Sequence, residues 1–170
     1  MPKGLTETSS LITIGFSLVE TAANTFTQSR VDLQLNPLDN EVFVVVAVDL
    51  DVENPDAQAA ANSQTNGSLT STSQTAVGSL ANSSTIATSQ KAIRGAGYVD
   101  GGVPFQKTSM ETPPAALTHI AIIATNDFFI QVTGGNNLLA KGMSGKMYGY
   151  RAKASAAQYA ALVQSEVLSN

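Results

Sequence analysis

The stretch Glu41-Val-Phe-Val-Val-Val-Ala-Val-Asp-Leu-Asp-Val-Glu53 decides the fold class of this chain. Its residues alternate between two faces: one face is apolar throughout, and the other changes from apolar to acidic at Asp49. A period of two over this length predicts a β-strand that is buried on both faces at its start and solvent-exposed on one face at its end. We expect the continuous apolar face to consist of Val44, Val46, Val48, Leu50 and Val52.

Outward from this strand, alternating or apolar runs bounded by turn residues predict further strands. They cover residues 10–19, 25–35, 68–75, 84–93, 119–125, 127–133 and 145–153. Residues 119–125 and 127–133 are separated by a turn at Asn126-Asp127, so we expect these two strands to form a hairpin. Tyr148 and Tyr150 fall on one face of the last strand.

Only the end of the chain has a helical pattern. Ser155 is a predicted N-cap, and Gln158 completes a capping box three residues later. The apolar residues that recur at helical spacing after it are Tyr159, Leu162, Val163 and Val167. About eight strands without alternating helices predict an all-β sandwich or barrel with one short C-terminal helix. A length of 170 residues suits a single domain over residues 1–170.

The composition indicates a mostly neutral surface. Charged residues make up 13% of the chain, about half the usual share for a soluble domain. A subunit whose surface is covered by neighbouring subunits tolerates so few charges, although a Ser/Thr-rich surface is also typical of an exported domain.

The chain has no cysteine, which excludes disulfides. No run approaches the roughly 20 apolar residues of a membrane-spanning helix, and we expect no secretory signal peptide.

Residues 57–90 contain no Lys, Arg, Asp, Glu, Pro or aromatic residue. Disordered polar segments usually carry high net charge or proline, so this neutral tract is not typical of disorder. We interpret it as a surface that packs against something.

The net charge is −4 and the pI is near 4.8. Because the sequence shows no basic patch interleaved with aromatic residues, a nucleic-acid-binding module is disfavoured. Acids dominate up to Asp56, and bases dominate after it. These two halves could attract each other between neighbouring copies, or could be ordinary solvated charges of one compact domain.

Asp49, Asp51, Glu53 and Asp56 are the candidate metal ligands. Alternating acids at the end of a strand offer the oxygen atoms that a hard cation such as Ca²⁺ prefers. The spacing does not fit an EF-hand, because Asn54 stands where that loop needs Gly and Ala60 where it needs Glu. The alternative is a solvated strand end whose charges discourage edge-to-edge pairing. We therefore predict no bound metal and no cofactor.

No other set of residues indicates catalysis. Residues 95–102 are rich in glycine, but neither Lys-Ser nor Lys-Thr directly follows the last glycine, so they do not predict a phosphate-binding loop. His119 is the single histidine and begins an apolar strand, which is typical of a structural role. A serine nucleophile needs a positioned base, and no Gly-x-Ser-x-Gly elbow occurs. We predict that the protein is not an enzyme.

Four runs carry a family resemblance. Leu35-Asn-Pro-Leu-Asp-Asn-Glu-Val-Phe-Val-Val opens the central strand; Thr118-His-Ile-Ala-Ile-Ile-Ala and Phe128-Phe-Ile-Gln-Val follow the long neutral middle; Met147-Tyr-Gly-Tyr-Arg precedes the terminal helix. In this order the features resemble single jelly-roll capsid proteins of small environmental viruses, as a pattern over most of the chain. The resemblance implies an eight-stranded jelly-roll sandwich whose copies tile a virion shell. Its partners would be copies of itself and other capsid proteins.

The chain departs from many such proteins in one respect, because it lacks the basic arm that packages nucleic acid. That absence fits a membrane-lined particle or an accessory shell protein better than direct genome binding. The competing class is an extracellular β-sandwich binding module, such as an adhesin or a carbohydrate-binding domain. Its sugar-binding strip would use Tyr98, Tyr148, Tyr150 and Tyr159, although packing in a core or an interface is the alternative use of these side chains.

Overall fold

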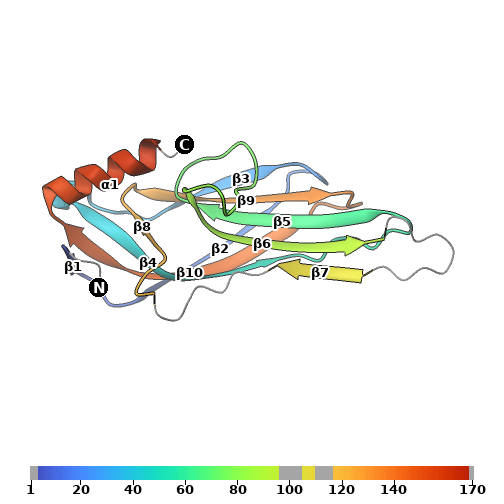
Figure 1. Ribbon diagram of the computed structural model, residues 1–170, viewed down its shortest axis with the longest axis horizontal. Helices are drawn as coiled ribbons and strands as arrows, with labels where there is room; N and C mark the ends of the chain where they lie inside the picture. Colours follow the sequence, from blue (N-terminus) through green and yellow to red (C-terminus); the bar gives the residue numbers. More distant parts are fainter. Residues whose placement is uncertain (1–3, 96–104, 110–116, 169–170) are drawn as a thin grey trace.

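The computed structural model describes residues 4–95, 105–109 and 117–168. They form two five-stranded antiparallel sheets, with one helix at one end of the molecule (Figure 1). This arrangement confirms the predicted all-β sandwich with a short C-terminal helix. Apart from Gly95, the glycine-rich segment 95–102 lies outside the described residues, and so does Tyr98.

The two sheets combine strands that are far apart in the sequence. Sheet A contains β1 (Leu5–Glu7), β2 (Ile12–Val19), β4 (Glu41–Val52), β8 (Ala121–Ile123) and β10 (Gly142–Ala154). Sheet B contains β3 (Thr27–Asp32), β5 (Asn62–Thr70), β6 (Thr85–Arg94), β7 (Phe105–Ser109) and β9 (Asp127–Gly135). A 3-10 turn, η1 (Pro37–Asp39), precedes β4, and the helix α1 (Ala156–Leu168) follows β10.

The order of the strands is that of a jelly roll. Sheet A has the order β2-β10-β4-β8, and it is matched by β3-β9-β5-β6 in sheet B. Such an order arises when two Greek keys wrap around one core. The other two strands are additions: β1 continues the line of β2 along β10, and β7 extends sheet B beyond β6.

The predicted hairpin of residues 119–125 and 127–133 is wrong. β8 pairs with β4 in sheet A, whereas β9 pairs with β3 and β5 in sheet B. The turn between them therefore carries the chain from one sheet to the other. Asn126 anchors this crossing, because its carbonyl oxygen accepts the Leu33 N–H at 2.8 Å and its side-chain oxygen accepts the Leu35 N–H at 2.5 Å.

One strand of the neutral tract is also placed differently from the prediction for residues 68–75. β5 spans Asn62–Thr70, and residues 71–84 connect it to β6. The amphipathic pattern of β5 is hidden in the sequence because its inward positions include Ser63 and Thr65, which are polar although they are buried. A period-two hydrophobic pattern therefore does not mark the start of this strand.

β4 confirms the central prediction but not its continuous apolar face. All four residues 42–45 are fully buried, whereas Asp49 and Asp51 are exposed. The register with β10 skips Val46, because Tyr148 opposes Ala47 and Gly149 opposes Val45. This β-bulge reverses the alternation. Val48, Leu50 and Val52 consequently face the core between the sheets together with Phe43 and Val45, while Val44 faces outward beneath α1.

The core between the sheets is closed by large side chains from both of them. Phe43 and Met147 of sheet A and Leu69, Phe128 and Ile130 of sheet B are almost completely buried. Burial of each such side chain contributes about 1.5–3 kcal/mol. The rings of Phe16 and Phe128 meet edge to face across the core, with 5.7 Å between centroids.

The helix α1 covers a second, smaller apolar cluster on the outer face of sheet A. Ser155 is the N-cap as predicted, and its Oγ accepts the Gln158 N–H at 3.4 Å. Tyr159, Leu162 and Val163 pack on the cluster that contains Val44. Val167, the fourth predicted apolar contact, is 61% exposed.

Glu166 is buried on α1 in place of Val167. Its Oε2 accepts the backbone N–H groups of Ala124 and Thr125 at 2.9 and 3.0 Å, in the turn after β8. Burial raises the pKa of the Glu166 carboxyl, although these N–H groups oppose that shift. The same carboxyl therefore ties α1 to the sandwich and carries an electrostatic penalty when it is charged.

The pH dependence of stability should report this penalty. Because the pKa is raised in the folded state, the folded protein holds the proton of Glu166 more tightly than the unfolded chain does. We expect the free energy of unfolding to fall as the pH rises from 4.5, the usual value of this group, through the raised pKa. Glu166→Gln keeps an oxygen acceptor and should remove that fall, as measured by urea denaturation at a series of pH values. An unchanged pH slope in the variant would contradict this assignment.

Candidate functional site

The four candidate acids do not form one site. Asp49 and Asp51 lie on the outer face of sheet A, and the Asp51 carboxylate pairs with Lys91 Nζ at 2.8 Å. Glu53 is exposed beside Gly142, and Asp56 belongs to a separate cluster with Lys141. Among the described residues, no three His, Asp or Glu side chains lie close enough together to hold a metal ion.

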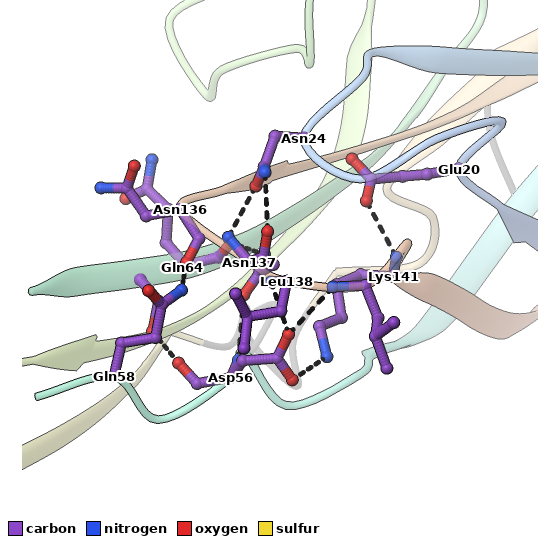
Figure 2. Close-up of polar contacts among 11 residues, drawn as sticks. Glu20, Asn24, Asp56, Gln58, Gln64, Asn136, Asn137, Leu138 and Lys141 are labelled. Atoms are coloured by element: carbon purple, nitrogen blue, oxygen red, sulfur yellow. Dashed lines mark hydrogen bonds and ion pairs between the residues drawn. The ribbon is translucent and has the colours of Figure 1, made fainter.

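Asp56 is the centre of a polar cluster that holds the loop between β9 and β10 (Figure 2). Its Oδ1 accepts the Lys141 ammonium group at 2.6 Å, and its Oδ2 accepts the backbone N–H groups of Leu138 and Leu139 at 2.8 and 3.2 Å. The hydrogen bond from Lys141 lowers the pKa of the Asp56 carboxyl, and the two N–H groups act in the same direction. The side chain of Lys141 is only 9% exposed.

Glu20 provides a second carboxylate anchor from the end of β2. This residue is 4% exposed. Its two oxygens accept the Gly134 N–H at 2.6 Å and the Lys141 N–H at 2.8 Å. The backbone of Lys141 is thus fixed by Glu20 while its side chain is fixed by Asp56.

Amide side chains complete the cluster. Asn24 exchanges two hydrogen bonds with the backbone of Asn137, at 2.8 and 2.7 Å. The Asn137 side chain accepts the Asp56 N–H and donates to the Gln64 carbonyl, both at 2.9 Å. Gln58 donates to the Asn136 carbonyl. Asn24 and Asn136 have positive φ values of 61° and 55°, which asparagine adopts more readily than most residues.

The cluster presents an exposed apolar pair. We call residues 136–141 the tip loop. Its Leu138 and Leu139 are 71% and 70% exposed although their backbone N–H groups are bound by Asp56. The sequence pattern does not mark this pair, nor does it mark Glu20 and Lys141. The available signal was the occurrence of two leucines directly after the turn Gly134-Gly-Asn-Asn.

The neutral tract packs largely against its own chain. Gln131 of β9 is fully buried on the outer face of sheet B, where its amide bonds to Ser68, Thr70 and Gln28 at 2.7, 2.7 and 3.0 Å. Residues 71–84 fold over this network, and the Gly78 N–H donates to Ser68 Oγ at 2.9 Å. Several hydroxyl and amide groups of the tract are thus satisfied internally, whereas the buried hydroxyl groups of Thr65 and Thr85 have no hydrogen-bond partner among the described residues. The tract leaves a neutral hollow of about 440 Å³ beside Leu80.

The acidic and basic halves of the chain meet within one molecule. Among the described residues, four of the five ion pairs join an acid up to Asp56 to a later base: Asp39–Lys153, Glu41–Arg151, Asp51–Lys91 and Asp56–Lys141. Charge separation along the sequence therefore serves internal pairing. It supplies no separate argument for attraction between copies.

The remaining sequence candidates show no catalytic arrangement in the described part of the chain. The ring of His119 is partly buried just before β8, and the hydrogen bond given for it is to its neighbour Thr118, at 3.1 Å. No helix among the described residues is long and apolar enough to cross a membrane.

The fold and the loop geometry define a jelly-roll sandwich with an apolar tip held by buried polar groups. Comparisons with known families, with curated proteins and with solved structures found no match.

Proposed function

We propose that this protein is a structural shell subunit, a capsid protein of a virion, that assembles with copies of itself and acts without catalysis. The observation that carries the proposal is the tip loop: two leucines are exposed on a backbone that is already fixed by Asp56, Glu20 and Asn24. An ordered contact segment loses little conformational entropy when it binds. The jelly-roll strand order and the low share of charged residues support the same role.

The strength of the proposed contact suits a shell better than a dimer. Burial of two leucine side chains supplies about 3–6 kcal/mol. Association costs roughly 4–15 kcal/mol in lost translational and rotational freedom, so the tip alone does not sustain a stable pair. In a closed assembly each subunit contacts several neighbours, and contacts of this size add up. We therefore expect assembly above a threshold concentration.

The test is light scattering after size-exclusion chromatography over a range of concentrations, with electron microscopy of the peak fractions. Shells, rings or other closed oligomers support the proposal. A monomer at every concentration would contradict it and would favour the binding-module class.

The tip leucines should control assembly without controlling folding. The double substitution Leu138→Ser and Leu139→Ser removes exposed apolar surface, so we expect a melting temperature close to that of the wild type. Its threshold concentration for assembly should rise by about tenfold or more, which corresponds to roughly 1.4 kcal/mol per contact. Leu11→Ser is the matched control, because Leu11 is 62% exposed in the segment between β1 and β2. Equal thresholds for the two variants would exclude the tip loop as the contact.

A further inference from the structure

A hollow of about 400 Å³ lies on the outer face of sheet A, where β2, β10 and β4 are neighbours. It is separate from the tip loop and is not used by the proposed assembly contact. Its volume is within the range of small-molecule sites. The residues around it are Gly15, Phe16, Asp49, Asp51, Ser144, Gly145, Lys146 and Tyr148.

The hollow arises because a side chain is missing from the outer face. Gly15 of β2 opposes Lys146 of β10, which in turn opposes Asp49 of β4. A Cβ atom added to Gly15 would have no atom within 4 Å, so the space above this glycine is open. The neighbouring rows across the sheet contribute Tyr148 on one side and Ser144 on the other.

Several polar groups around the hollow have no partner in the described part of the chain. Asp49 and Lys146 face each other in register but form no ion pair, and the hydroxyl groups of Ser144 and Tyr148 form no hydrogen bond. Asp51 differs, because Lys91 neutralises it at 2.8 Å. The hollow is therefore lined by residues that carry a carboxylate acceptor, an ammonium donor, two hydroxyl groups and a phenol ring.

We propose that this hollow binds a neutral saccharide. A sugar hydroxyl both donates and accepts, so one ligand can satisfy Asp49 and Lys146 together. The Tyr148 ring offers an apolar surface for the C–H face of a pyranose. Asp49 and Lys146 carry opposite charges. A charged ligand would therefore be attracted by one of these groups and repelled by the other, which removes the advantage of a ligand charge. The shallow site predicts weak binding, which many copies on one particle would strengthen.

The experiment is saturation-transfer difference NMR on the protons of lactose and maltose, which works for a monomer and for a large assembly. We expect a saturable signal with the wild type. Gly15→Val should weaken binding by about tenfold or more because it fills the hollow, and Tyr148→Leu should do the same because it removes the ring. Ser17→Val is the matched control: it places the same side chain on the same face of β2, outside the hollow.

Circular dichroism melting shows whether each variant is folded, and the open space at Gly15 makes Gly15→Val compatible with the sheet. No saturable signal from either sugar, or an equal signal from Gly15→Val and Ser17→Val, would overturn the saccharide site. Assembly is scored separately by light scattering. Sugar binding by a permanent monomer would refute the shell proposal alone, and assembly without sugar binding would refute this inference alone.

Discussion

Gly149→Ala should destabilise the protein by about 3 kcal/mol, near the upper end for overpacked cores. A Cβ atom at this position would lie 2.3 Å from the Val44 carbonyl oxygen and 2.4 Å from Cε1 of Phe43. The carbonyl belongs to β4, which pairs with β10 at the bulge, so it moves only if the central ladder of sheet A is disturbed. Urea denaturation at neutral pH measures the loss directly.

Gly15→Ala is the control for Gly149→Ala. Both glycines lie in strands of sheet A, but a Cβ at Gly15 meets nothing within 4 Å. We expect its free energy of unfolding to stay within about 0.5 kcal/mol of the wild-type value, as for other surface substitutions. If the two variants were equally stable, β10 would not approach β4 closely at Gly149.

Lys141→Met should cost about 3 kcal/mol of stability. The substitution keeps the apolar stem of the side chain but leaves the Asp56 carboxylate without its cation, and removal of one partner of a buried pair typically costs 3–5 kcal/mol. We place the effect at the lower end because the Asp56 side chain is 24% exposed. Lys153→Met tests an exposed pair, with side chains 53% and 61% exposed, and should change stability by less than about 1 kcal/mol.

Lys141→Met should also change the acid sensitivity of the protein. Lys141 lowers the pKa of Asp56, so this pair stabilises the folded state at pH values above 3.8 and is lost as the pH falls through the lowered pKa. Lys141→Met should weaken that acid-induced loss, as measured by urea denaturation between pH 2 and pH 5. Hydrogen exchange at Leu138 and Leu139 should also become faster in the variant, because their N–H groups bond to Asp56. Unchanged exchange there would argue against Asp56 as the anchor of the tip loop.

These effects concern residues whose roles in the structure differ from those that the sequence pattern indicates. Asp56 was a candidate metal ligand because it follows a row of acids, and in the structure it stabilises a loop together with Lys141, which is 85 positions away. The spacing of the acids does not distinguish a metal ligand from a loop anchor, since both roles need a carboxylate after the strand. The leucines of the tip loop were overlooked because apolar residues after a turn normally begin the next strand.

The sequence by itself determined the elements whose pattern is local. The alternation in residues 41–53 predicted β4, the Ser155 cap predicted the start of α1, and the absence of helical periodicity elsewhere predicted an all-β sandwich. The tertiary structure alone decided the bulge at Val46, the assignment of β8 and β9 to different sheets, the ion-pair partners and the exposure of Leu138 and Leu139. Local periodicity reports which side of a strand is apolar. Register, sheet membership and charge pairing depend on contacts between residues distant in the chain, and only packing selects among them.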